Sequence, residues 1–300
     1  MEPIFRNMTR AELDIAYNNV KAEPDFARLM ARYQKSSRVF YEIFAVERDI
    51  AYGSASRQRF DWVSCGHPTA PTFVFIHGGY WQNYTKEDLA FVALGPIARG
   101  FNVVLAEYTL APQASMTQIV GEIGSLLHHL AASDSAAGFG GRPVCMCGHS
   151  AGGQLAALHR SHAAVDVTVA VSGLFDLEPI SLSWLNDKLK LTATEIAEYS
   201  PQRHIGRETP TIVSVGSAEL PELVRHSTEY AEACRVNGEV ATYLALEGRT
   251  HFAILKDIGT PNSAILEAVA KTIGSVEVRG RTPTERLAVD HAEMNEKEQS

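Results

Sequence analysis

The sequence predicts an α/β fold with a mainly parallel, twisted sheet, helices on both faces and a small cap insertion. Two features of the chain from residue 72 onwards indicate this class. Short continuous apolar runs alternate with longer segments in which apolar residues recur every three or four positions. Such runs are typical of strands buried on both faces, and their alternation with helices implies parallel strands joined by helical crossovers. The runs are TFVFI, NVVLA, RPVCMC, DVTVAVS, PTIVSVG and ATYLAL.

The chain before this alternation has a different character. Residues 10–45 contain no glycine, and the amphipathic stretches FARLMARY and RVFYEIF predict one or two helices. In the next run, RQRFDWVS, large and polar side chains alternate. This pattern predicts a half-buried edge strand, which we expect to form part of an antiparallel N-terminal hairpin.

Two later segments have a clear helical period. In TPNSAILEAVAKTI, Thr260 is placed to cap a helix and Pro261 to occupy its first turn. The apolar stripe of this helix comprises Ile265, Leu266, Val269 and Ile273. That of the earlier helix comprises Met116, Ile119, Val120, Ile123, Leu126, Leu127 and Leu130.

We expect a single domain over residues 1–277, a length common for α/β domains. Residues 1–45 form its N-terminal helical segment. Residues 173–209 separate two buried strands by more chain than a crossover needs, which predicts a cap-like insertion over the strand ends. The stretch 278–300 is dense in charge and is expected to be a peripheral C-terminal extension.

Composition argues against several classes of function. The 300 residues carry a formal net charge of −8 without a Lys/Arg cluster, so nucleic acid is not an expected partner. No stretch approaches the roughly 18 apolar residues that span a bilayer. The charged N-terminus lacks the apolar core of a signal peptide, so we expect no membrane association and a cytoplasmic location.

The numbers and spacing of cysteine and histidine argue against disulfide bonds and against a metal site. The four cysteines are too few for a disulfide framework and suit a reducing compartment. No Cys or His pair has metal-ligand spacing, so neither a metal nor another cofactor is expected. The sequence is compatible with a homodimer.

The segment CMCGHSAGGQLAAL joins a buried strand to a helix and contains a G-x-S-x-G motif centred on Ser150. In this setting the serine occupies a sharp strand-to-helix turn, and the flanking glycines remove side chains that would clash. Its hydroxyl is then exposed at the N-terminus of a helix. We therefore expect Ser150 to be a nucleophile.

A serine hydroxyl needs a base to remove its proton and an acid to orient that base. With this architecture the acid and the histidine follow the serine in that order, each in a loop after a later strand. His251 follows ATYLAL and is the expected base. Glu219 follows PTIVSVG and is the expected acid, with Asp176 and Glu222 as its rivals.

The loop that follows the first buried strand, HGGYW at residues 77–81, suits an oxyanion hole. Attack by serine on a carbonyl develops a negative oxygen that needs amide donors aimed at it in advance. We expect the backbone amides of Gly78, Gly79 and Ala151 to supply them, since glycine leaves the backbone free to turn. His77 is expected to brace this loop by hydrogen bonding.

HGGYW together with GHSAGG resembles the arylformamidase (kynurenine formamidase) group of α/β-hydrolases. EYTLAP at 107–112, SGLFDLEPI at 172–180, the SP pair at 200–201 and ELPELVRHS at 219–227 are also similar to that group. The resemblance spans about residues 15–275. Related hormone-sensitive-lipase-like esterases usually carry a third glycine after HGG, where this chain has a tyrosine, which favours the formamidase group.

The resemblance implies an α/β-hydrolase fold and a triad of serine, aspartate and histidine, which maps onto Ser150, Glu219 and His251. The chain departs from the group at the acid, where glutamate replaces aspartate. The resemblance also implies hydrolysis of a small N-formyl arylamine such as N-formylkynurenine.

Four aromatic residues are candidates for substrate binding, either by narrowing the acyl side or by stacking on an aryl ring. Two of them, in the glycine loop, could instead pack in the core. The same machinery would suit a carboxylesterase or amidase acting on other small aryl or acyl substrates, and a non-catalytic ligand-binding homologue is a third alternative. The four are Tyr80, Trp81, Trp184 and Phe252.

Overall fold

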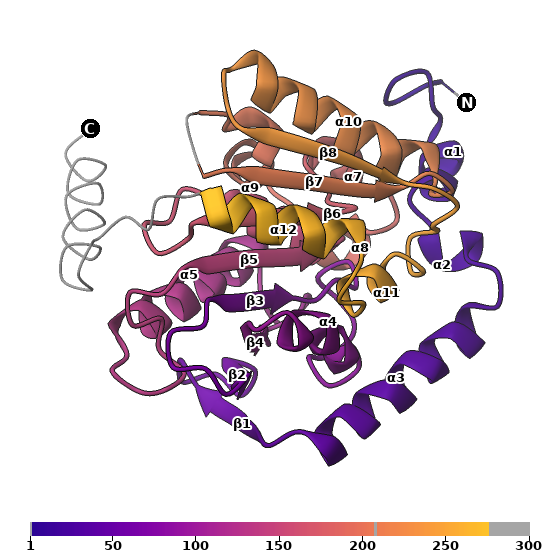
Figure 1. Ribbon diagram of the computed structural model, residues 1–300. Helices are drawn as coiled ribbons and strands as arrows, with labels where there is room; N and C mark the ends of the chain where they lie inside the picture. Colours follow the sequence, from indigo (N-terminus) through magenta and orange to yellow (C-terminus); the bar gives the residue numbers. More distant parts are fainter. Residues whose placement is uncertain (1, 207–208, 276–300) are drawn as a thin grey trace.

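The computed structural model describes residues 2–206 and 209–275. In this part of the chain one eight-stranded sheet has the order β1-β2-β4-β3-β5-β6-β7-β8 (Figure 1). β2 pairs antiparallel with β1 and with β4, and all other neighbours pair in parallel. The α/β class and the N-terminal hairpin are therefore confirmed. The strands are β1 (Val46–Ala51), β2 (Arg59–Val63), β3 (Thr72–Ile76), β4 (Asn102–Ala106), β5 (Val144–His149), β6 (Val167–Val171), β7 (Thr211–Gly216) and β8 (Ala241–Leu246).

Two strands occupy positions that differ from the sequence prediction. β2 is not an edge strand, because β1 covers its outer side, and Asp61 on it is fully buried. The Asp61 carboxylate is held by Lys86 Nζ at 3.0 Å and by the Tyr41 hydroxyl at 2.6 Å. β8 is the opposite edge, and its residues are partly buried or exposed rather than buried on both faces. Its apolar sequence predicted a central strand because composition does not reveal whether a further strand pairs beyond it.

Side chains that alternate along β3 point into two separate cores. Val74 and Ile76 pack with α5 and α6, whereas Phe73 and Phe75 pack with α3, α4, α11 and α12. α12 and α4 lie in front of the sheet in Figure 1. The longer helices are α3 (Phe26–Ile43), α5 (Met116–Ala132), α6 (Ala151–Leu158), α10 (Pro221–Val236) and α12 (Ala264–Ser275); the shorter ones are α1 (Arg10–Ala16), α2 (Asn19–Ala22), α4 (Leu94–Ala98), α7 (Glu178–Ser181), α8 (Asn186–Leu189), α9 (Ala193–Tyr199) and α11 (Leu255–Ile258), with 3₁₀ turns η1 (Ala90–Ala93) and η2 (Pro201–Arg203).

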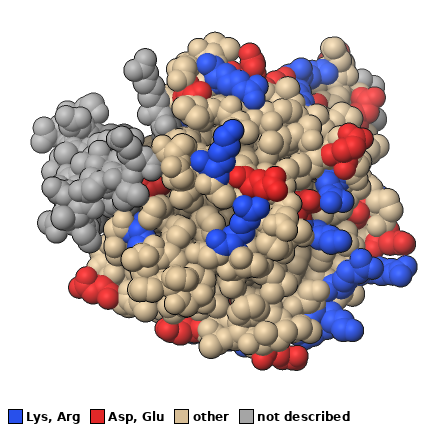
Figure 2. Space-filling view, in the orientation of Figure 1, with Lys and Arg blue, Asp and Glu red and all other residues tan. Residues whose placement is uncertain are grey.

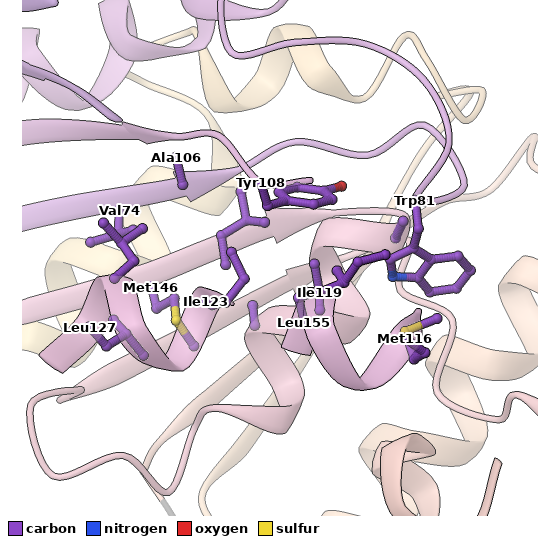
Figure 3. Packing of buried hydrophobic residues seen from close by; sticks show 14 of the residues in the cluster. Val74, Trp81, Ala106, Tyr108, Met116, Ile119, Ile123, Leu127, Met146 and Leu155 are labelled. Atoms are coloured by element: carbon purple, nitrogen blue, oxygen red, sulfur yellow. The ribbon is translucent and has the colours of Figure 1, made fainter. Parts of the chain in front are cut away.

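The two periodic segments form helices, but one starts later than predicted. α5 buries its apolar stripe against the sheet and α6; in Figure 3 Ile123 and Leu127 lie near Met146 of β5, and Ile119 lies beside Leu155 of α6. α12 begins at Ala264, so the predicted cap at Thr260 is wrong. Ser263 is the cap instead, because its hydroxyl accepts a hydrogen bond from the Leu266 amide at 3.2 Å.

The N-terminal segment contains three helices rather than one or two. α1 is closed by a capping box between Thr9 and Glu12, and Asn18 caps α2. FARLMARY and RVFYEIF belong to the single helix α3, which starts two residues after Pro24. Proline disfavours helical geometry in the residue before it, so it separates α2 from α3.

Residues 173–209 carry the short helices α7 to α9 and the turn η2. Their apolar side chains, including Leu177, Ile180 and Leu185, join the core on the α5 side of the sheet. The predicted C-terminal extension, 278–300, lies outside the described residues. Within the described ranges, no helix combines the length and apolarity needed to cross a bilayer. On the face seen in Figure 2, Lys/Arg and Asp/Glu side chains are interspersed.

Candidate active site

Ser150 occupies the junction between β5 and α6, at a position of backbone strain. Its φ of 57° and ψ of −118° lie in a region that non-glycine residues rarely adopt. The turn is tight enough that a Cβ on Gly148 would collide with the backbone of Gly152. The Ser150 amide donates to the Val171 carbonyl of the neighbouring strand at 2.8 Å. This geometry lifts the hydroxyl out of the sheet, as the motif predicts.

Three side chains from distant parts of the chain form one hydrogen-bonded series. Ser150 Oγ lies 3.0 Å from His251 Nε2, and His251 Nδ1 lies 2.7 Å from Glu219 Oε2. The residues are 3%, 5% and 8% exposed, respectively, so water has little access to the bonds between them. Glu219 follows β7 and His251 follows β8, at the carboxyl ends where parallel strands place such loops.

The other acids considered from the sequence point elsewhere. Asp176 Oδ1 accepts from the Glu178 amide at 3.0 Å within its own loop. Glu222 lies in the first turn of α10, where it binds Arg225 at 2.6 Å and accepts from the Tyr17 hydroxyl at 3.2 Å. Neither residue is hydrogen-bonded to His251.

Sequence reasoning missed a residue that holds the acid. Ser172 Oγ donates to Glu219 Oε1 at 2.6 Å, and the Gly216 amide donates to the same oxygen at 2.8 Å. The sequence signals for Ser172 were its position directly after β6, which lies next to β7 in the sheet, and its place at the start of SGLFDLEPI.

Hydrogen bonds connect the loop that contains His251 to the turn at Ser150 and to the N-terminal segment. His149 Nε2 donates to the His251 carbonyl at 2.8 Å, and burial holds the pKa of His149 well below its ordinary value. The next residue, Phe252, accepts at its carbonyl from the Tyr33 hydroxyl at 3.1 Å. These bonds fix the backbone at His251 and at the residue that follows it.

The glycine loop passes directly over the serine. A Cβ on Gly78 would lie 2.8 Å from the His149 carbonyl oxygen and 3.0 Å from Ser150 Cβ, so only glycine permits this approach. Gly79 has a φ of 106°, which likewise favours glycine. Within the described chain, no hydrogen bond uses the amides of Gly78, Gly79 or Ala151 as donors. These N–H groups are therefore available to a ligand beside Ser150.

His77 makes the bracing contacts that the sequence predicted. Its Nδ1 lies 2.8 Å from the Gly78 carbonyl oxygen and its Nε2 lies 3.1 Å from Glu107 Oε1. The ring is fully buried and stacks on Tyr108 with centroids 4.5 Å apart.

A pocket of about 250 Å³ opens onto Ser150 and His251. Three of the four predicted substrate-binding residues, Tyr80, Trp184 and Phe252, line it. Trp81 does not, and the structure corrects that prediction. Its side chain is fully buried among core residues (Figure 3), and its indole N–H donates to Gln154 Oε1 at 3.1 Å.

The N-terminal segment supplies a wall of the pocket that the sequence did not predict. Val20, Phe26 and Met30 line it, whereas the 173–209 insertion contributes only Trp184 among the described lining residues. The apolar face of FARLMARY was the available signal, but it predicted helix packing rather than a pocket. Among the described residues that line the pocket, none is Lys, Arg, Asp or Glu. No group of three or more His, Cys, Asp or Glu in the described ranges is arranged to hold a metal.

The fold and the comparisons with known proteins define a class: the chain is a hydrolase with an α/β-hydrolase fold. A family model described as BD-FAE matches residues 64–172. The chain is similar over nearly its whole length to the kynurenine formamidase of Danio rerio, with 26% identity over 90% of this chain and 98% of that protein. Kynurenine formamidase of Drosophila melanogaster is 27% identical over 65% of this chain and 71% of its own length.

A solved structure of a putative thioesterase from a Silicibacter species has a TM-score of 0.77 at 26% identity, covering 86% of this chain and 99% of that one. An esterase from Pyrobaculum calidifontis, at 18% identity and a TM-score of 0.68, shares the fold, covering 89% of this chain and 98% of its own. The resemblance to arylformamidases is therefore confirmed, and so is the α/β-hydrolase fold.

Proposed function

We propose that the protein is a serine hydrolase that cleaves a small acyl amide or ester through Ser150, His251 and Glu219. The observation that carries the proposal is the continuous series of bonds from Ser150 Oγ through both nitrogens of His251 to Glu219 Oε2. A nucleophile, a base and an orienting acid within hydrogen-bond reach of one another are what covalent acyl transfer requires.

In the first half of the reaction, His251 Nε2 takes the Ser150 proton as Oγ attacks the substrate carbonyl. The carbonyl π electrons move to oxygen, and the amides of Gly78, Gly79 and Ala151 stabilise the resulting oxyanion. Glu219 accepts the hydrogen bond from His251 Nδ1–H and stabilises the imidazolium. His251 then protonates the leaving amine or alcohol as the bond to the acyl carbon breaks.

In the second half, His251 removes a proton from water, which attacks the acyl-serine. The tetrahedral intermediate collapses, the Ser150 oxygen regains its proton from His251, and the carboxylic acid leaves. Every proton moves through His251 Nε2, and no cofactor takes part in the scheme.

For the substrate we propose an N-formyl arylamine, with N-formylkynurenine as the first candidate. The support is the similarity to proteins named kynurenine formamidase and the aromatic walls of the pocket. An arylamine leaves more readily than an alkylamine, and a formyl group needs little acyl space. Phe252 and Tyr80 are placed on the pocket wall, where they could contact an aryl ring.

A second candidate is a carboxylesterase or amidase that acts on uncharged aryl or acyl substrates. The lining favours it because none of the described wall residues carries a charge that could pair with the amino-acid head of kynurenine. Among the described residues, the charged group that bonds to Phe252 is an acid, Glu23, whose Oε2 accepts from the Phe252 amide at 3.4 Å.

Side-by-side kinetics on N-formylkynurenine, formanilide and short p-nitrophenyl esters separate these candidates. If kcat/KM for the ester exceeds that for N-formylkynurenine by more than about a hundredfold, nearly 3 kcal/mol, the general esterase is the better description. If the formyl substrates lead, the formamidase proposal stands.

A non-catalytic ligand-binding protein is the alternative from another class. A fluorophosphonate probe decides this point, because it phosphonylates only an activated serine. We expect labelling at Ser150 in the wild type and none in Ser150→Ala. Folded wild-type protein that resists the probe would favour the binding protein.

A further inference from the structure

A cluster of charged side chains lies behind the glycine loop, with His77 and Glu107 buried and Arg57 partly exposed. Glu107, which follows β4, accepts at Oε1 from Arg57 Nη2 at 2.6 Å, from the Tyr108 amide at 2.9 Å and from His77 Nε2 at 3.1 Å. Its Oε2 accepts from the Lys86 amide at 3.0 Å. Burial alone would raise the pKa of the Glu107 carboxyl, but the charges of His77 and Arg57 hold it below its ordinary value. With donors facing both oxygens, the group is a carboxylate.

The two partners of the His77 ring establish its protonation state. Nε2 faces this carboxylate, and Nδ1 faces the carbonyl oxygen of Gly78 at 2.8 Å. Both partners can only accept, so each ring nitrogen must carry a hydrogen. A neutral imidazole has only one, and its remaining lone pair would face an oxygen. The contacts are therefore those of an imidazolium.

The same contact orients the oxyanion donor. In a planar trans peptide, the N–H of one residue points opposite to the carbonyl of the residue before it. Because the Gly78 carbonyl points at His77, the Gly79 N–H points away from His77. The Gly79 N–H has no acceptor among the described residues, and Gly78 and Gly79 both line the pocket that contains Ser150.

We propose that His77 is an imidazolium, held between Glu107 and the Gly78 carbonyl, that positions the Gly78–Gly79 peptide and places a positive charge behind the oxyanion hole. Arg57 supplies a second cation to the same carboxylate, so the cluster of His77, Glu107 and Arg57 keeps a net positive charge. A fixed charge in a site with little water stabilises a developing oxyanion without reorganisation. His77 and Glu107 are positioning residues in this scheme, which rests on the proposed serine mechanism.

The charge of His77 is measured directly by ¹⁵N NMR of histidine-labelled wild-type protein. We expect one ring to show both nitrogens protonated in the folded protein, with a signal that disappears in His77→Asn. A neutral tautomer at His77 would overturn the proposal. This measurement uses the native protein and needs no variant to be active.

The effect on the oxyanion is measured with an aryl trifluoromethyl ketone. Ser150 Oγ adds to its carbonyl carbon, His251 takes the proton, and the former carbonyl oxygen becomes a stable oxyanion. In Glu107→Gln we expect kcat to fall on the order of 10- to 100-fold with KM within about threefold, and ketone affinity to weaken by the same factor as kcat. Affinity for the neutral amine product should stay unchanged.

Two further His77 variants separate the two contacts. Asparagine retains a donor near the Nδ1 position, whereas glutamine retains one near Nε2, and neither carries a charge. We expect both to lose ketone affinity, with the smaller loss in His77→Asn, which keeps the bond to the glycine loop. Equal ketone affinity in wild type and both variants would overturn the proposal.

Glu239→Gln is the matched control for loss of a buried charge pair. Glu239 binds Arg160 Nη2 at 2.8 Å, and both side chains are buried, yet neither residue lines the pocket. The Glu239→Gln variant should have a lower Tm but an unchanged ratio of ketone affinity to product affinity. If Glu107→Gln behaves like this control, the role of Glu107 is structural only and the proposal fails. Failure of the serine mechanism can be told apart from failure of this proposal. In that case the wild-type protein would resist the fluorophosphonate, whereas NMR would still show a doubly protonated His77.

Discussion

Glu219 contacts His251 through only one of its two carboxylate oxygens. Oε2 accepts from His251 Nδ1 at 2.7 Å, while Oε1 is held by Ser172 Oγ at 2.6 Å and by the Gly216 amide at 2.8 Å. The carboxylate thus joins the ends of β6 and β7 to the histidine loop. The glutamate side chain reaches both its anchors and the imidazole, so it fits this position, where the resemblance implied an aspartate.

The triad acid is tested by three substitutions. Glu219→Gln should lower kcat by about 10³- to 10⁴-fold, because an amide stabilises the wrong imidazole tautomer. Glu219→Asp should also be impaired, since it is one methylene too short to keep both contacts. Asp176→Asn is the control and should be mild, because Asp176 bonds within its own loop. Steady-state kinetics check the ranking, and the reverse order would assign the acid to Asp176.

Ser172→Ala tests the anchor of the acid. Loss of a hydrogen bond to a charged group should lower kcat about tenfold while leaving KM nearly unchanged. Ser227→Ala is a matched control, since Ser227 is also fully buried but its hydroxyl has no hydrogen-bond partner among the described residues. Equal kinetics for the two variants would show that Ser172 does not position Glu219.

The N-terminal wall of the pocket predicts a role for α3 in substrate binding. Phe26 lines the pocket and packs edge-on against Phe252 with ring centroids 4.9 Å apart. Phe26→Ala should raise KM several-fold, because it removes apolar contact area and frees Phe252. Val39→Ala on the exposed side of the same helix should leave KM unchanged. A normal KM in Phe26→Ala would remove α3 from the binding site.

For Trp81 we expect an effect on stability rather than on substrate binding. Trp81→Phe leaves Gln154 Oε1 without its donor in the core, which should cost about 1–3 kcal/mol of unfolding free energy. Because Trp81 does not line the pocket, KM should change little. Urea unfolding and kinetics on the same preparation measure both quantities, and a raised KM with unchanged stability would return Trp81 to the pocket wall.

His226 predicts how stability depends on pH. Its Nδ1 accepts from the Phe175 amide at 3.0 Å, and its Nε2 lies 2.8 Å from the Tyr17 hydroxyl. Burial, with the nearby Arg225 charge, lowers its pKa to about 3. In the unfolded chain the ordinary pKa is about 6.5. Below that value the unfolded state binds a proton that the folded state refuses, so stability falls as the pH drops from about 6.5 towards 3.

His226→Asn tests this linkage, because it can keep an acceptor for the Phe175 amide but does not titrate. Between about pH 6 and 4, the unfolding free energy of the wild type should decline more steeply than that of the variant, by up to about 1.4 kcal/mol per pH unit. Urea titrations at several pH values measure the two slopes. Parallel slopes would mean that His226 is not the group responsible.

The sequence by itself determined the features that depend on short stretches of chain. Continuous apolar runs indicated buried strands, and apolar residues at every third or fourth position indicated helices. Their alternation predicted the α/β class, because these patterns depend only on the local geometry of each element. The turn at Ser150 was predictable for the same reason, since the strained backbone and the flanking glycines lie within five residues. The chain order of serine, acid and histidine then narrowed the base to His251.

Only the tertiary structure decided the features that depend on residues distant in the sequence. Glu219 and Asp176 both follow strands, and which of them meets His251 depends on how those loops pack across the sheet edge. Phe26 reaches the pocket only because α3 packs against the loop of Phe252. Trp81 and Tyr80 are adjacent in the chain and both are buried, yet only Tyr80 also lines the pocket. A sequence pattern indicates which side chains tend to be buried, but the packing of the whole chain decides which partners they meet.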